Sequence, residues 1–360
     1  MECIICRTEK DQSEMSDEHV IPDSLGGYYH IYNVCRPCNS KMGETVDSPL
    51  INNKITELYR FCEQLQGKSG NIPNPFTGTI IGADDPAVKA RAIVGEDGVL
   101  RFVLLPRVHV NEEDGVVKSI EISVDVEDEA KIEPILQKKL ARLGVDSSGG
   151  IQGGRVRSVL EGGFWTRWEI DARNFKIGLL KIAYEFAVDS IESFYDTDEA
   201  REIARILHET NYEAVEGFVK IGSGLQPEVF DPFTDYLDVN SRKHYLVLIQ
   251  TDMGLVCCIK LHSLFCVGIV LSTRRLLVGH EAIFGINDIV QRSFRKLDMN
   301  ELVAECLGPT HIRPGYFFAT EAEAALASGD VNSPTFRYQS DANGDPKLYS
   351  AIGVLDRRPL

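Results

Sequence analysis

The chain has 360 residues, 43% hydrophobic and 26% charged, which is typical of globular proteins and long enough for two or three domains. Its formal net charge of −16 argues against a general surface for polyanions, so a nucleic acid would have to be bound by a local basic patch. The longest apolar run, residues 255–271, is interrupted by polar side chains, and we expect no membrane span.

Four of the nine cysteines form two Cys-x-x-Cys pairs, Cys3 with Cys6 and Cys35 with Cys38. The N-terminus MECIICRTEK lacks a basic region followed by an apolar core, so we expect no secretory signal and a cytoplasmic protein, where disulfides are rare. Two intervening residues let both sulfur atoms of a pair reach one ion at about 2.3 Å. The spacing predicts a structural Zn²⁺ site that supplies the folding free energy this short, polar segment lacks.

Between the cysteine pairs the sequence predicts a strand, a turn, a second strand and a helix. DEHVIP (residues 17–22) and the Tyr- and Ile-rich YYHIYNVC (residues 28–35) are the two expected strands. Gly26 and Gly27 lie between them and can adopt positive φ angles. CNSKMG begins a helical turn that Gly43 can end.

The order of Glu18-His19, then Asn33 before the second cysteine pair and Asn39 after it, closely resembles the HNH endonuclease family, also called ββα-metal or His-Me finger nucleases. The matching stretches are EHVIP, GG, NVCRPCNSKMG and the flanking CIIC, so the resemblance covers residues 1–45. It implies a zinc-stabilised ββα fold and endonuclease activity on DNA. Free-standing nucleases of this kind often serve in restriction or antiphage defence.

The resemblance also implies a role for each matched residue. His19 corresponds to the general base that takes a proton from the attacking water, and an imidazole with a pKa of about 6.5 suits this role at neutral pH. Glu18 and Asn39 correspond to the ligands of a catalytic Mg²⁺ or Mn²⁺, and Asp17 is a neighbouring carboxylate that could share this role. Asn33 corresponds to the asparagine that holds the loop and helps orient the histidine.

Three further residues near the motif, His30, Arg36 and Lys41, are candidate nucleic-acid contacts, since Arg and Lys dominate contacts to phosphate. Each residue taken singly has a simpler interpretation. A histidine beside a turn and a glutamate on a strand are common surface residues, and Asn39 could be a helix N-cap. The nuclease interpretation depends on all of them occurring in this order inside the zinc frame.

For the chain as a whole we expect an α+β fold with three regions. The first, residues 1–70, is the nuclease domain with its zinc site and a following amphipathic helix that starts at Ser48-Pro49. The apolar face expected for this helix consists of Ile51, Ile55, Leu58, Cys62 and Leu65. Residues 75–160 are expected to be rich in strands. Residues 161–360 are expected to be α+β, with a helical pair at 173–210 and antiparallel strands at 244–272.

Two alternatives to a constitutive nuclease stay open. The zinc unit could be a non-catalytic module that binds nucleic acid or protein. The chain could also be a nuclease that is inactive until a ligand or partner binds the C-terminal region, which the low basic charge favours. The C-terminal region is also a candidate for target selection or homo-oligomerisation, and the sequence does not identify its ligand.

Overall fold

The computed structural model describes residues 1–67, 70–95, 98–145, 152–160, 162–171, 173–219, 227–277 and 282–311, together with residues 339–340 and 346–347. The chain divides into two compact units. The first comprises Met1–Glu185 and Arg201–Lys220, and the second Phe186–Ala200 and Ile221–Leu360. Among the described helices, none combines the length and the apolar character needed to cross a lipid bilayer.

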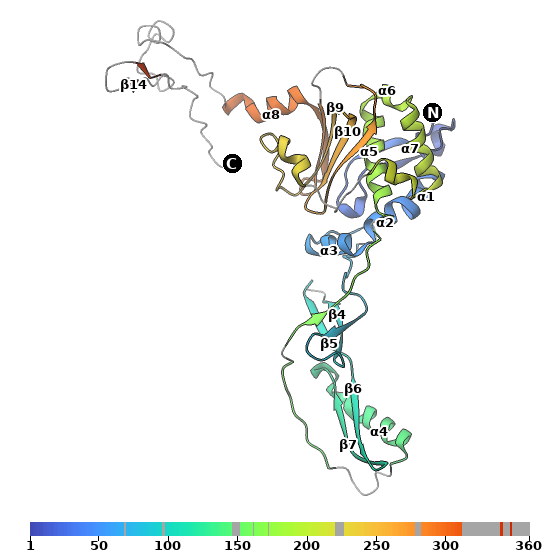
Figure 1. The fold of residues 1–360 in the computed structure, drawn as a ribbon, viewed down its shortest axis with the longest axis vertical. Helices are drawn as coiled ribbons and strands as arrows, with labels where there is room; N and C mark the ends of the chain where they lie inside the picture. Colours follow the sequence, from blue (N-terminus) through green and yellow to red (C-terminus); the bar gives the residue numbers. More distant parts are fainter. Residues whose placement is uncertain are drawn as a thin grey trace. The chain divides into compact units, whose positions relative to one another are not determined.

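The first unit begins with the predicted ββα arrangement (Figure 1). Strands β1 (Met15–His19) and β2 (His30–Cys35) pair antiparallel, and helix α1 (Arg36–Met42) follows at once. The connection closes at Gly26, whose φ of 80° lies in the left-handed region that favours glycine. A Cβ atom on Gly27 would lie 1.9 Å from the Ile21 carbonyl oxygen, so the close approach of these two backbones requires glycine.

The helix after the second cysteine pair continues past Gly43, where the sequence predicted its end. Gly43 has right-handed helical angles, with φ −55° and ψ −39°, whereas a helix-ending glycine adopts the left-handed conformation. The chain runs on through a π-helical turn, η3 (Gly43–Asp47), into helix α2 (Ser48–Ile51). The prediction of a helix end at Gly43 was wrong.

The next helix, α3 (Lys54–Cys62), is separate from α2 and buries a different face from the predicted one. Asn53 caps it, accepting a hydrogen bond from the Thr56 amide at 3.0 Å. Because the helix restarts at this cap, the apolar spacing counted across residues 48–65 does not describe one continuous face. Cys62 is exposed, and the buried side chains of α3 are Thr56, Tyr59 and Arg60.

The remainder of the first unit contains two antiparallel sheets. The four-stranded sheet has the order β5-β4-β3-β8, and β6 and β7 form a hairpin. The strands are β3 (Thr79–Gly82), β4 (Lys89–Val94), β5 (Leu100–Leu104), β6 (Arg107–Glu113), β7 (Val116–Ser123) and β8 (Phe164–Trp165). Helix α4 (Ile132–Leu143) follows the hairpin.

Helix α5 (Lys176–Ser190) is buried around almost its whole circumference, as expected for a helix with few polar side chains. Its first ten residues belong to the first unit. Gly178 lies against helix α2, where a Cβ atom would approach the Leu50 side chain to 2.8 Å. This packing brings two of the charged residues of α5, Lys181 and Glu185, into the interior of the first unit with no solvent exposure.

The second unit is built on a five-stranded antiparallel sheet in the order β11-β10-β9-β12-β13. Its strands are β9 (Lys243–Thr251), β10 (Gly254–Leu261), β11 (Phe265–Ser272), β12 (Ala282–Asp288) and β13 (Ser293–Asp298). Alternate residues of these strands form a hydrophobic cluster with Phe233 and Leu302. Its described helices are the last turn of α5, α6 (Glu192–Tyr195), the first turn of α7 (Asp198–Glu209) and α8 (Met299–His311). The fold is α+β, as predicted.

Two glycines near the N-terminal ββα unit provide a matched test of this backbone packing. Gly27→Ala should lower the free energy of unfolding by about 1–3 kcal/mol, because its methyl group collides with the Ile21 carbonyl. Gly43→Ala should be neutral or stabilising by up to about 1 kcal/mol, because Gly43 is helical and nothing lies within 4 Å of its added methyl. Hydrogen exchange of the β1 and β2 amides measures both effects, and equal losses would contradict this account.

Candidate functional site

The four N-terminal cysteines meet at one point in the structure. The sulfur atoms of Cys3, Cys6, Cys35 and Cys38 all lie within 4.8 Å of one another, and none of them forms a disulfide. Sulfur atoms on a tetrahedron with metal–sulfur bonds of about 2.3 Å would be about 3.8 Å apart. The Cys6 and Cys35 sulfurs are 3.9 Å apart, so the arrangement fits a closed structural zinc site.

Backbone hydrogen bonds attach this cysteine cluster to the ββα unit. The Cys35 amide donates to the Cys3 sulfur at 3.3 Å, and the Ile4 amide donates to the Asn33 carbonyl at 3.0 Å. The hydroxyl of Tyr184, on α5, donates to the Ile4 carbonyl at 2.6 Å. The hydrogen bond between Cys3 and Cys38 lowers the pKa of Cys3 and raises the pKa of Cys38, so one proton lies between two sulfurs that zinc would bind as thiolates.

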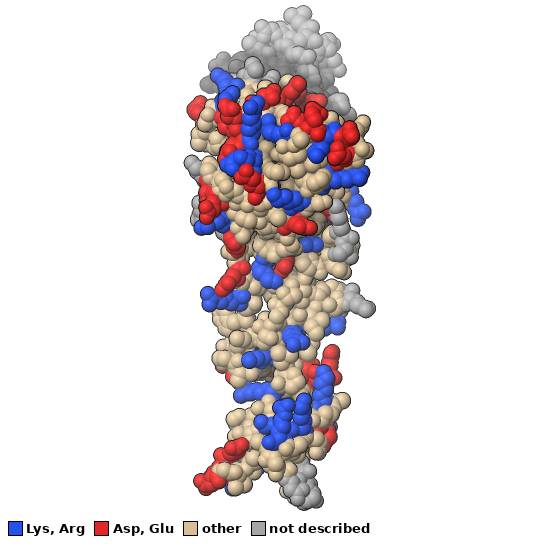
Figure 2. All heavy atoms as spheres, turned by 90° about the vertical axis from the view of Figure 1, so that its right-hand side faces the viewer, with Lys and Arg blue, Asp and Glu red and all other residues tan. Residues whose placement is uncertain are grey.

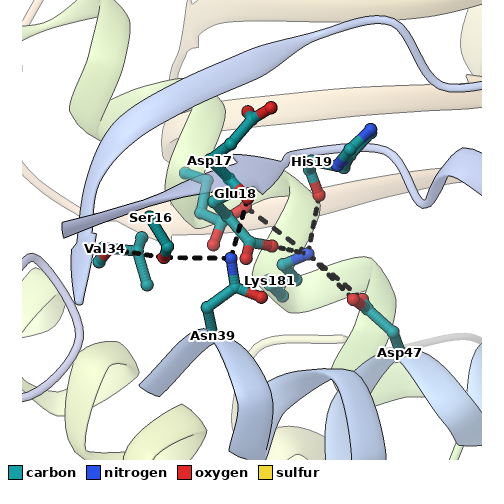
Figure 3. A network of polar contacts seen from close by, with 9 residues as sticks. Ser16, Asp17, Glu18, His19, Val34, Asn39, Asp47 and Lys181 are labelled. Carbon is teal, nitrogen blue, oxygen red and sulfur yellow. Dashed lines mark hydrogen bonds and ion pairs between the residues drawn. The ribbon is translucent and has the colours of Figure 1, made fainter. Parts of the chain in front are cut away.

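Strand β1 presents its polar side chains on two opposite faces. In Figure 3, Asp17 and His19 point to one side of the strand and Glu18 points to the other. Successive residues of a strand alternate between its faces, and Glu18 is only 3% exposed whereas Asp17 is exposed. The structure therefore separates the side chains of the adjacent pair Glu18 and His19.

The more exposed face gathers Asp17, His19 and His30. His30 on β2 is the cross-strand partner of His19, and their ring centroids are 4.2 Å apart. The pairing register shifts between Ser16 and Glu18, and Asp17 occupies this irregularity. Asp17 Oδ1 lies 2.7 Å from His30 Nδ1, and the metal-binding atoms of all three residues lie within 4.8 Å of one another.

On the opposite face, Glu18 forms an ion pair with the buried ammonium group of Lys181. Lys181 also donates to the His19 carbonyl at 2.8 Å and to the two carboxylate oxygens of Asp47 at 3.1 and 3.2 Å (Figure 3). Burial alone would lower the pKa of Lys181, but the surrounding carboxylates, Asp47 foremost, raise it above its usual value. Lys181 is therefore a permanent cation beneath β1.

Glu185 lies one helical turn beyond Lys181, with a carboxylate oxygen 3.7 Å from its ammonium nitrogen. Both of its carboxylate oxygens are buried, and neither has a hydrogen-bond partner among the described residues. Burial raises the pKa of Glu185 well above its usual value, although the charge of Lys181 opposes this shift. The carboxyl group is therefore biased towards its protonated, neutral form.

Asn39 connects helix α1 to strand β1. Its amide nitrogen donates to the Ser16 hydroxyl at 3.1 Å and to the Asp17 carbonyl at 2.9 Å. The Ser16 hydroxyl in turn donates to the Val34 carbonyl at 2.8 Å, so the chain of bonds joins both strands to the helix (Figure 3). The amide of Asn39 thus holds the ββα unit together at the level of the candidate site.

The other predicted residues occupy varied positions. The side-chain oxygen of Asn33 is buried without a hydrogen-bond partner in the described part of the chain. Arg36, the first residue of α1, is exposed, whereas the Lys41 ammonium donates to the carbonyl oxygen of His208. Arg36 is the more available of these two cations for contact with a phosphate.

Sequence reasoning missed Lys181, Asp47 and Glu185. A signal was present in α5, because Lys181 and Glu185 are spaced four apart in the otherwise apolar stretch IGLLKIAYEFAV. Charged residues are rarely fully buried unless they are paired, so such a pair in an apolar helix indicates a buried ionic contact. The spacing alone could not identify Glu18 and Asp47 as its partners.

Zinc binding should depend on the cluster and on no other cysteine. We expect a single zinc ion per chain by elemental analysis and its loss in Cys38→Ser. Structural zinc supplies on the order of 10 kcal/mol, so this loss should make residues 1–50 sensitive to proteolysis. Cys62→Ser, at an exposed cysteine outside the cluster, is the control and should retain the metal. Retention of zinc by Cys38→Ser would contradict the assignment.

Replacing Glu185 by a residue that does not titrate should stabilise the protein at neutral pH. Its folded-state pKa is raised, so the folded chain binds the extra proton, and the free energy of unfolding should fall as the pH rises above the usual glutamate value of about 4.5. Glu185→Gln should abolish this fall. At a pH above the folded-state pKa, its free energy of unfolding should exceed that of the wild type by about 1.4 kcal/mol for each pKa unit of the shift.

Denaturant unfolding between pH 4 and pH 8 measures the effect, with Glu44→Gln, at an exposed glutamate of the same unit, as the control. Destabilisation by Glu185→Gln would instead show that the ionised carboxylate is needed by Lys181.

The comparisons with known proteins agree with this geometry. Residues 3–55 match a family model described as HNH endonuclease. No curated protein and no solved structure matches the chain. The match spans the cysteine cluster, both strands and helices α1 and α2. Residues 3–55 of this chain are therefore similar to the HNH endonuclease family.

Proposed function

We propose that the protein is a metal-dependent endonuclease that hydrolyses phosphodiester bonds of DNA. The observation that carries this proposal is the position of His19 on the accessible face of a zinc-framed ββα unit, beside Asp17 and His30. The family match supports nuclease activity and implies a nucleic-acid substrate. The role in restriction or antiphage defence remains a family-level expectation.

In this proposal His19 is the general base. Its backbone is fixed by the hydrogen bond from Lys181 to its carbonyl, and its ring packs beside that of His30. A neutral imidazole in this position can take the proton from a water that attacks the phosphorus atom. Asn39 and the cysteine cluster hold the strand that carries His19, which is a positioning role.

A divalent cation would neutralise charge on the scissile phosphate and on the leaving oxygen. Glu18, the carboxylate ligand expected from the resemblance, does not fit this role as it is arranged. The Glu18 carboxylate is buried against the Lys181 ammonium, whereas Asn39 uses its amide nitrogen to donate hydrogen bonds to Ser16 and Asp17. Magnesium at Glu18 would have to displace a buried ion pair, which is costly.

The charge distribution favours DNA binding through a few local contacts. On the face that Figure 2 shows, Lys and Arg side chains are interspersed with Asp and Glu side chains. With a net charge of −16, binding should involve few phosphate contacts and weaken only modestly with added salt. The exposed Arg36, at the start of α1, is a candidate for one of these contacts.

His19→Ala should abolish plasmid cleavage while leaving the fold and the zinc content unchanged. Loss of a general base costs about 10²–10⁴-fold in rate, so nicked and linear products should disappear on the time scale of the wild-type reaction. The assay uses supercoiled plasmid with Mg²⁺, Mn²⁺ or EDTA, and the wild type should cut only with a divalent metal.

His109→Ala, which changes an exposed histidine on β6, is the matched control and should cut at the wild-type rate. Cleavage by His19→Ala at that rate would refute the proposal. A folded, zinc-loaded wild type that cuts no substrate would favour the non-catalytic binding module or a nuclease that needs a ligand or partner at its C-terminal region.

A further inference from the structure

The accessible face of the β1–β2 pair carries a donor set that differs from the one expected from the resemblance. Asp17 and His30 are in direct contact, with 2.7 Å between Oδ1 and Nδ1. Ligand atoms on neighbouring corners of an octahedron with bonds of about 2.1 Å lie about 3.0 Å apart. The two side chains therefore need to separate by only a few tenths of an ångström to hold one ion between them.

We propose that Asp17 and His30 are the ligands of a divalent transition-metal ion, and that His19 stands beside this ion as the general base. The inference rests on the proposed function and deepens it by naming the metal ligands. It replaces Glu18 and Asn39 as the metal-binding pair and turns His30, a predicted nucleic-acid contact, into a ligand.

The strand geometry supports this pair over Glu18. Asp17 and His19 lie on the same face of β1, and His30 lies directly across from His19, so the metal would be next to the reacting water. Glu18 is on the opposite face, where Lys181 already supplies a positive charge. A metal ion there would compete with an ammonium group that has no solvent exposure.

The chemistry of the pair selects the class of metal. A ligand set of oxygen atoms alone suits Mg²⁺, whereas an imidazole nitrogen shifts the preference towards Mn²⁺, Co²⁺, Ni²⁺ or Zn²⁺. Two protein ligands on an accessible face leave the remaining positions to water and to phosphate oxygens of the substrate. Binding would displace the proton that Asp17 and His30 share in their hydrogen bond.

Paramagnetic broadening by Mn²⁺ tests the site without reference to cleavage. The full-length protein is first given one equivalent of zinc, which the cysteine cluster binds, and Mn²⁺ is then added below one equivalent. We expect the imidazole resonances of His19 and His30 to broaden before those of the exposed His109, because broadening falls steeply with distance from the ion. An excess of Mg²⁺ of about tenfold should leave the broadening in place.

Two variants at the site and one control complete the experiment. Asp17→Asn and His30→Gln should each weaken Mn²⁺ binding at least about tenfold, as read from the His19 resonance. Glu44→Gln removes the same charge as Asp17→Asn from an exposed position on the same unit and should behave as the wild type. Unchanged broadening in both site variants, or no broadening in the wild type, would overturn the inference.

The same proteins in the plasmid assay separate this inference from the proposed function. DNA cleavage without broadening at His19 and His30 would leave the nuclease standing and refute the metal site. Broadening that depends on Asp17 and His30 in a protein that cuts no DNA would support the site and refute the nuclease. Broadening lost in Glu18→Gln but kept in Asp17→Asn would place the metal at Glu18 and overturn the inference.

Discussion

The ammonium group of Lys181 joins three separate parts of the chain at a point with no access to solvent. It contacts the Glu18 carboxylate, the His19 carbonyl and the Asp47 carboxylate, and so ties strand β1 and the turn η3 to helix α5. Burying an ammonium ion costs several kcal/mol, which such contacts can offset only when the geometry is well satisfied. Breaking the network would leave unpaired buried charges, so the position of β1, and with it His19, depends on this contact.

This network and the cysteine cluster both hold the same small unit. The cysteines hold the N-terminal segment against the end of β2 and the start of α1. Lys181 donates a hydrogen bond to the His19 carbonyl of β1, and Asn39 links β1 to α1. Residues 1–50 bury a small apolar core that includes Ile21, Leu25 and Leu50. The cysteine cluster, the buried ion network and the Asn39 amide add fixed contacts to this core, as suits a unit too small to be ordered by core packing alone.

The face of β1 on which each residue lies determines the chemistry available to it. Glu18 and His19 are adjacent in sequence, yet strand alternation directs their side chains to opposite faces. The carboxylate that accompanies His19 on the accessible side is Asp17, and the irregular register between Ser16 and Glu18 places it near His30. Residues that are adjacent in a sequence motif can therefore lie on opposite faces of the strand that carries it.

The cysteine cluster, the ββα order and the α+β class could be predicted from the sequence, because these depend on close spacing and on local propensities. The predictions of a helix end at Gly43 and of one apolar helix face along residues 48–65 did not hold. Glycine is compatible with either helical hand, and the cap at Asn53 starts a new helix. The contact between Lys181 and Glu18 was visible only in the tertiary structure. The two residues are separated by 162 others, and nothing in the sequence near either of them indicates a distant ionic partner. The tertiary structure also placed Asp17 and His30 in contact, because strand register depends on how both strands pack and not on either alone.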